Sequence, residues 1–135
     1  IAEKKSIVIK CDFSRDNKLF VRGNHDQLLE VFENLLDNAI TYTDDDKKVS
    51  VSVKQDINYQ IVEITDQGVG IGEQDLARIT ERFFRCTSSL DYKRHSSGLG
   101  LSIVKHILNR HEGKLEVTSE LGKGSIFRAY LPIYS

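Results

Sequence analysis

Stretches in which apolar and polar residues alternate recur along the chain, and they predict six β-strands. A period of two places successive side chains on opposite faces of a sheet, so each stretch offers one face to a core. Polar or glycine-rich turns separate neighbouring strands at 14–17, 56–58 and 121–124. The predicted strands cover residues 6–11, 19–22, 49–54, 59–64, 114–119 and 125–132.

A helical period replaces this alternation in three places. Asn24 precedes the longest helix as an N-cap, and Gln27 stands where a capping box needs its second side chain. A short helix from Glu73 to Arg82 has an acidic first turn, and a further helix runs from Leu99 to Arg110. The first helix carries an apolar stripe that predicts tight packing on a sheet, made of Leu28, Phe32, Leu35 and Ala39 and widened by Leu29, Leu36 and Ile40.

The order of these elements predicts an α/β fold of two layers. Strands and helices do not alternate regularly, which excludes a doubly wound parallel sheet. We expect a two-layer sandwich in which a mixed, mostly antiparallel sheet is covered on one face by about three helices. Residues 85–97 show no apolar period, and a loop of about 13 residues in so compact a domain is typically a functional lid.

Length, charge and cysteine content limit the class of protein. A chain of 135 residues suits one domain, and a net charge of −1 without a basic stretch excludes a nucleic-acid binder. Cys11 and Cys86 have no metal-ligand neighbours, which favours a reducing cytosol over a disulfide framework. No apolar run approaches the roughly 20 residues that cross a bilayer. Because the chain opens without methionine, we expect a single domain, residues 1–135, excised from a larger protein.

Two asparagines stand out in the first helix because asparagine is a poor helix former. Asn34 and Asn38 are four positions apart, so both amides project from one edge of the helix. An amide oxygen is a hard neutral ligand that can complete the shell of a magnesium ion already held by phosphates. The alternative is that both side chains simply face solvent beside the apolar stripe, which is equally common.

An aspartate and two glycines follow the strand at 59–64. Ile64 points into the core, so we expect Asp66 on the same side of the sheet, at the rim of a pocket. A buried carboxylate can accept a hydrogen bond from an exocyclic amine, while Gly68 and Gly70 allow the backbone to approach a flat ring closely. Taken alone, such a sequence is more often an ordinary chain-reversing turn.

A glycine-rich run, Ser96-Ser97-Gly98-Leu99-Gly100-Leu101-Ser102, precedes the last helix. Unpaired N–H groups at a helix start, with glycines that permit close approach, form an anion site for phosphates. An ordinary loop-to-helix junction capped by a serine is the alternative. No strand leads directly into the run and no Gly-Lys-Ser/Thr follows it, so it is neither a dinucleotide fingerprint nor a P-loop.

The order of these motifs resembles the GHKL superfamily of gyrase, heat-shock chaperone, histidine kinase and mismatch-repair ATPases. The sensor histidine kinases, and among them the phosphate-responsive and related membrane receptors, are the most similar. The likeness spans nearly the whole chain, and five motifs in order are far more specific than any one. They are an N box at 33–39, a glycine box at Asp66-x-Gly68-x-Gly70, an F box at 81–85, a second glycine box at 98–101 and a closing strand motif at 122–127.

The resemblance implies a Bergerat-type fold that binds ATP and Mg²⁺. Asn38, with Asn34 beside it, is expected to hold the metal and the triphosphate, and Asp66 the adenine amino group. Arg85 is expected to share the catalytic role with the two asparagines, by reaching the phosphates from the lid. The other nucleotide-binding residues that the resemblance implies are Tyr42, Gly68, Gly70, Ile71, Phe83, Lys93, Arg94, Ser97, Gly98, Leu99, Gly100, Leu101 and Ser125, the last where relatives often carry threonine.

Two positions depart from the pattern of the family. Thr41 stands where many relatives carry lysine, so one phosphate contact is lost or passed to the lid. Residues 95–97 replace a glycine pair followed by threonine or serine. The hinge of the lid is therefore stiffer, because a residue with a Cβ resists the positive φ that glycine accepts.

Asn34 also bears on the choice between hydrolysis and phosphoryl transfer. Superfamily members that hydrolyse ATP place a glutamate one turn before the metal asparagine, and Asn34 takes that place here. An amide cannot act as a general base, and Glu33 lies about 100° around the helix. The resemblance therefore favours transfer of the γ-phosphoryl group to an external acceptor.

The acceptor histidine is expected outside this chain. Pro132 is the only proline, so no His-Glu/Asp-x-x-x-Pro motif occurs, and the four histidines (25, 95, 106 and 111) are interpreted as surface or cap residues. The resemblance implies a phosphoacceptor on separate dimerisation helices and a downstream response regulator. It also implies a monomeric isolated domain and a homodimeric full-length receptor, of which this is the cytoplasmic part. An anti-sigma-type serine kinase and an ATP-binding pseudokinase are the alternatives on the same fold.

Overall fold

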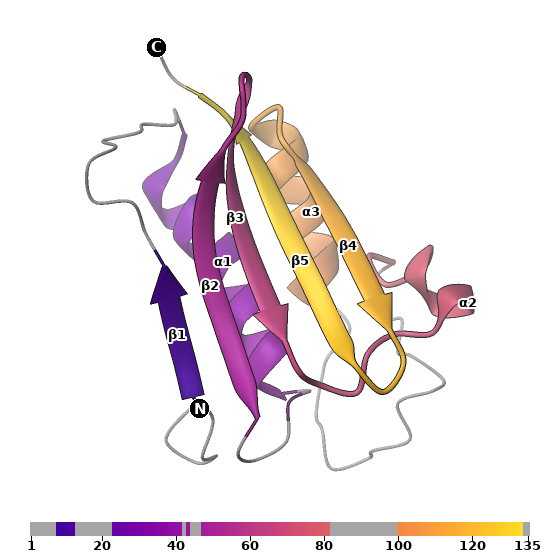
Figure 1. Ribbon diagram of the computed structural model, residues 1–135. Coiled ribbons are helices and arrows are strands. Elements are labelled where there is room, and N and C mark those ends of the chain that lie inside the picture. Colours follow the sequence, from indigo (N-terminus) through magenta and orange to yellow (C-terminus); the bar gives the residue numbers. More distant parts are fainter. Residues whose placement is uncertain (1–7, 13–22, 42, 44–46, 82–99, 134–135) are drawn as a thin grey trace.

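The computed structural model of the protein describes residues 8–12, 23–41, 43, 47–81 and 100–133 (Figure 1). The predicted strand at 19–22 and the predicted lid at 85–97 lie outside these residues. Within them, the order of elements follows the sequence expectation. The elements are β1 (Val8–Asp12), α1 (His25–Thr41), β2 (Lys48–Gln55), β3 (Tyr59–Asp66), α2 (Glu73–Leu76), α3 (Gly100–Arg110), β4 (Lys114–Glu120) and β5 (Gly124–Pro132).

The strands form one five-stranded sheet in the order β1-β2-β3-β5-β4. β1 pairs with β2 in parallel, and every other pairing is antiparallel. Figure 1 shows α1 and α3 together behind one face of this sheet, with α2 beyond its β4 edge. The predicted two-layer sandwich with a mixed, mostly antiparallel sheet is confirmed.

All three predicted helices are present among the described residues, but α2 is shorter than predicted. It is a single turn that ends at Leu76 and continues as turns to Thr80. No side chain caps the start of α2 at Gly72, and an uncapped helix of this length has little stability of its own. The expectation of a short helix reaching Arg82 is therefore wrong for residues 77–81.

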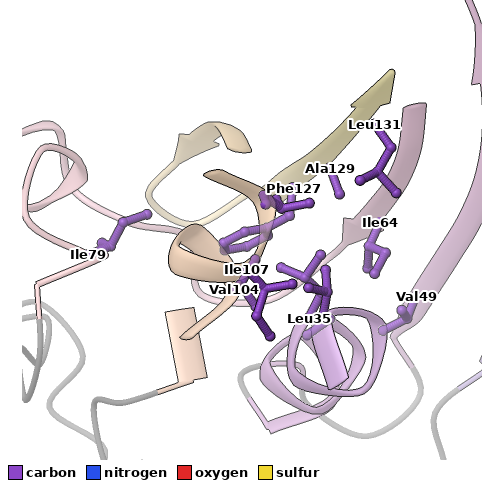
Figure 2. Packing of buried hydrophobic residues seen from close by; sticks show 12 residues of the cluster. Leu35, Val49, Ile64, Ile79, Val104, Ile107, Phe127, Ala129 and Leu131 are labelled. Carbon is purple, nitrogen blue, oxygen red and sulfur yellow. The ribbon is translucent and has the colours of Figure 1, made fainter. Parts of the chain in front are cut away.

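The core lies where α1 and α3 pack against the sheet. Leu35 of α1, Val104 of α3 and Ile64 and Phe127 of the sheet are buried and converge there (Figure 2). Ile40 is buried as predicted, whereas Leu29 is 46% exposed, and the fully buried residue one turn before Leu35 is Val31. Leu28, Phe32 and Leu36 are partly buried against the core, as predicted. The predicted stripe is therefore wrong only in including Leu29 and in omitting Val31, which shares a face with Leu35 four residues later.

A histidine joins the two helices at the N-terminal end of α1. The N–H of Gln27 donates to Oδ1 of Asn24 at 2.9 Å, which confirms Asn24 as the cap. The N–H of Asn24 donates at 3.0 Å to Nε2 of His111, just beyond α3, and not to the Gln27 side chain that the predicted capping box required. Because Nε2 accepts, Nδ1 carries the proton and donates to the Ile107 carbonyl at 2.8 Å. His111 is therefore a structural residue, as expected.

Replacing Glu112 by glycine is expected to stabilise the domain by about 1 kcal/mol. Glu112 is exposed and has a φ of 60° where α3 ends, a conformation that costs a residue with a Cβ about 1–2 kcal/mol but costs glycine little. Urea unfolding monitored by circular dichroism would measure the gain. Glu112→Ala is the matched control, since it removes the same side chain and keeps the strain. An equal gain in both variants would show that the side chain, and not the backbone, was unfavourable.

Among the described residues, no helix combines the length and the apolar character needed to cross a membrane.

Candidate functional site

A row of polar residues crosses β3, β5 and β4 immediately beyond the core. Asp66 of β3 pairs with Ser125 of β5, and Ser125 pairs in turn with Ser119 of β4. The adjacent row on the same face, two residues along each strand, is apolar and contains Ile64 and Phe127. The period of two therefore places Asp66, Ser125 and Ser119 on the helix-covered side, at the rim where the core ends.

Asp66 is held by backbone groups from two different segments. It is 5% exposed, and its Oδ1 accepts hydrogen bonds from the N–H of Gly68 at 2.8 Å and the N–H of Ser125 at 3.2 Å. Burial raises the pKa of this carboxyl, while the two backbone hydrogen bonds lower it in part. Among the described residues no group donates to Oδ2, so a buried acceptor is left for a ligand. The predicted burial of this carboxylate, on the same side of the sheet as Ile64, is confirmed.

The loop at 67–72, which carries the first glycine box, is docked on the β4–β5 hairpin. The N–H of Gly122 donates to the carbonyl of Val69 at 2.9 Å, and the N–H of Ile71 donates to Oγ of Ser119 at 2.7 Å. Gly70 has a φ of +76°, and a Cβ on it would lie 2.1 Å from the Glu120 carbonyl oxygen. Glycine is therefore required at position 70 both by its backbone conformation and by this contact.

Asn34, the first of the two asparagines of α1, lies beside the start of α3. Asn34 and Asn38 are half-buried, whereas Glu33 is exposed. A Cβ on Gly100 would lie 3.4 Å from Oδ1 of Asn34, so the N box meets Gly100 of the second glycine box. Figure 1 shows the end of α1, the start of α3 and the end of β3 at the same end of the domain.

The amide side chains of α1 suit a magnesium ion that receives most of its ligands from a nucleotide. Among the described residues no group of three or more His, Cys, Asp or Glu side chains could hold a metal by itself. Neutral amide oxygens such as those of Asn34 and Asn38 can complete an octahedral shell whose other ligands are phosphates and water.

Several predicted nucleotide ligands lie outside the described residues: Tyr42, Phe83, Arg85, Lys93, Arg94, Ser97, Gly98 and Leu99. The two predicted apolar contacts that lie inside the described residues, Ile71 and Leu101, are partly buried against the core. Ser119 is a residue of the polar row that the sequence reasoning missed. A signal for it exists, since Ser119 continues the inward-facing positions of Leu115 and Val117 on β4, where a serine is out of place.

The family of the protein follows from this fold and from a direct comparison. Residues 23–135 match the family of histidine kinase-, DNA gyrase B- and HSP90-like ATPases. The chain belongs to this family and is an ATP-binding domain of the histidine kinase type.

Its relatives are sensor kinases. The phosphate regulon sensor protein PhoR of Pseudomonas aeruginosa is 38% identical over 82% of the chain and 25% of its own length. The sensor histidine kinase RppB of Synechocystis is 36% identical over 96% of the chain and 29% of its own length. SenX3 of Mycobacterium tuberculosis is 37% identical over 97% of the chain and 32% of its own length. The chain thus spans about a quarter to a third of these relatives.

Solved structures agree with this assignment. The mycobacterial sensor histidine kinase MprB superposes with a TM-score of 0.83 at 30% identity, over 98% of this chain and 86% of that one. The nucleotide-free catalytic domain of the histidine kinase ThkA superposes with a TM-score of 0.80 at 25% identity, over 97% and 83%. These matches to histidine kinases do not favour the serine kinase alternative.

Proposed function

We propose that this domain binds Mg-ATP and transfers its γ-phosphoryl group to a histidine on a separate dimerisation hairpin, in two-component signalling. The observation that carries the proposal is the buried carboxylate of Asp66, whose Oδ2 has no donor among the described residues. An exocyclic amine can fill that position and complete the hydrogen bonds of the carboxylate. Asp66 therefore binds the adenine amino group, and Ser125 beside it contributes to the recognition of the base.

The phosphates extend from this base site toward the start of α3. Asn34 lies beside Gly100, and unpaired N–H groups at a helix start attract anions. Asn38 and Asn34 hold the magnesium ion, which neutralises charge on the transferred group when it is bound. Arg85, Lys93, Arg94 and Gly98 lie outside the described residues, and their contacts with the phosphates stay predictions from the family resemblance.

Transfer is favoured over hydrolysis at this site. Asn34 has no basic side-chain atom and faces Gly100, while Glu33 is exposed on another side of α1. No side chain at position 34 can therefore deprotonate a water molecule next to the metal. The partners of the domain are the dimerisation helices of its own receptor, which carry the acceptor, and a downstream response regulator. The receptor is a homodimer with this domain on the cytoplasmic side.

A phosphotransfer assay tests the proposal. The chain is mixed with the phosphoacceptor hairpin of the same receptor, supplied as a separate polypeptide, and with labelled ATP and magnesium. We expect an acid-labile, alkali-stable phosphohistidine on the hairpin, and its loss in Asn38→Ala. Phosphate on serine would instead support the anti-sigma type of kinase. Bound ATP without transfer would identify a pseudokinase.

A further inference from the structure

Ser119 makes three polar contacts through one hydroxyl oxygen. Its Oγ lies 2.7 Å from the N of Ile71, 3.0 Å from the carbonyl oxygen of Gly124 and 2.7 Å from Oγ of Ser125. These contacts join the glycine-box loop, the start of β5 and the serine that neighbours Asp66 in the polar row. Thus Ser119 connects both segments that hold Asp66 without touching Asp66 itself.

The proton of each hydroxyl can be assigned by counting donors and acceptors. A serine hydroxyl has one proton to donate and two lone pairs that accept. The Gly124 carbonyl can only accept, so it takes the proton of Ser119, and the Ile71 N–H can only donate, so it occupies one lone pair. What remains on Ser119 is a single lone pair. The 2.7 Å contact with Ser125 is therefore a hydrogen bond in which Ser125 donates.

This assignment determines what Ser125 can offer a ligand. Its only proton is directed to Ser119, so the lone pairs of Ser125 face the base site as acceptors. Serine has no methyl group on Cβ to restrict χ1, so the contact with Ser119 also selects the rotamer of its side chain. With Oδ2 of Asp66, the rim then presents two acceptors and no side-chain donor from the polar row.

We propose that Ser119 is a positioning residue that sets the base specificity of the site by keeping Ser125 an acceptor. The inference rests on the proposed binding of adenine at Asp66. Two acceptors match the two N–H groups of a 6-amino purine and oppose the carbonyl oxygen of a 6-oxo purine. When Ser119 cannot accept, the hydroxyl of Ser125 is free to turn and donate to a 6-oxo group.

The test compares ADP with IDP, which carry the same phosphates and differ in the base. Calorimetric Kd values for both nucleotides are measured on the 135-residue chain and its variants. Ser119→Ala is expected to lower the preference for ADP over IDP about five- to tenfold, because one hydrogen bond to the base changes direction. Ser119→Thr keeps the hydroxyl and is expected to retain the wild-type ratio. Thr118→Ala, on the opposite face of β4 where Thr118 contacts Arg128, is the matched control and leaves the ratio unchanged.

The ratio separates a role in specificity from a purely structural one. If Ser119 only holds the loop at 67–72, Ser119→Ala weakens ADP and IDP equally, and the proposal is overturned. The proposal is also overturned if Ser119→Thr loses the ratio as fully as alanine does. The proposed function has its own criterion, which is loss of ADP binding in Asp66→Ala. An ADP affinity that depends on Asp66, together with a ratio that ignores Ser119, refutes this inference alone.

Discussion

Asp66→Ala is expected to lower the affinity of the domain for ATP and ADP by about 100-fold or more. The substitution removes the buried acceptor Oδ2 and also releases the N–H groups of Gly68 and Ser125, which donate to Oδ1. The amine of the base would then enter a site without a partner, which costs the full desolvation of that group. Calorimetric titration with ADP measures the loss. An unchanged affinity would refute the assignment of adenine to Asp66.

Asp66→Asn separates the charge from the shape of the side chain. The amide oxygen can still accept from Gly68 and Ser125, but an N–H donor replaces Oδ2 and repels the amine of the base. We expect nucleotide binding to fall nearly as far as in Asp66→Ala. The nucleotide-free domain should melt at a higher temperature than wild type at neutral pH, since a buried charge is removed. A lower melting temperature would show that the carboxylate stabilises the fold.

The pH dependence of the stability of the domain and of its nucleotide affinity follows from the raised pKa of Asp66. Because burial raises this pKa above the ordinary value of 3.8, the contribution of Asp66 to stability is present below 3.8 and is lost as the pH rises through the folded-state value. The stability advantage of Asp66→Asn over the wild type should therefore appear as the pH rises from 3.8 through the folded-state pKa, and it should level off above that pKa. Nucleotide binding needs the ionised form and changes in the opposite direction. It should weaken as the pH falls, starting above the range of an ordinary aspartate.

Gly70→Ala is expected to destabilise the domain by about 3 kcal/mol or more and to abolish nucleotide binding. A Cβ at position 70 would lie 2.1 Å from the Glu120 carbonyl oxygen. No side-chain rotation can relieve this clash, because the oxygen is a backbone atom and the position of the Cβ is fixed by the backbone. The loop at 67–72 must leave the hairpin, and the bond from Gly68 to Asp66 is lost with it. Urea unfolding and ADP titration measure the two effects.

Gly122 provides the matched control for this prediction. Its φ of +82° is close to that of Gly70, but nothing lies within 4 Å of a Cβ added there. Gly122→Ala therefore reports the backbone strain alone, about 1–2 kcal/mol, and should leave ADP affinity unchanged. Equal losses in the two variants would show that conformational strain, and not contact with Glu120, makes glycine necessary at position 70.

Features of the molecule that depend on local periodicity were predictable from the sequence. Alternation along β3 assigned Ile64 to the core, and the same alternation placed Asp66 at the rim, where the structure has it. The spacing of Asn34 and Asn38 on one edge of α1 is likewise a property of a single helix. The nucleotide ligands expected at 82–99 stay predictions, because they lie outside the described residues.

Features that depend on pairing between distant segments were not predictable. The backbone N–H of Ser125 donates to Asp66 across 59 positions, and the backbone N–H of Asn24 donates to His111 across 87. Neither partner can be chosen from the sequence, since almost every residue carries a backbone N–H and several histidines are equally available. Ser119 was missed for the same reason, because its importance lies in three bonds that the strand order β3-β5-β4 creates. The extent of α2 was overestimated because acidic residues favour the start of a helix and do not determine its length.

The docking of the 67–72 loop on the β4–β5 hairpin has a thermodynamic consequence for the choice among nucleotides. The conformational entropy of this loop is lost when the domain folds, so an arriving base meets groups that are already fixed. Binding of the base therefore carries little of the ordering cost that usually reduces affinity. ATP, ADP and AMP should therefore gain the same binding free energy from the adenine base. The differences between their affinities should come from the phosphates alone.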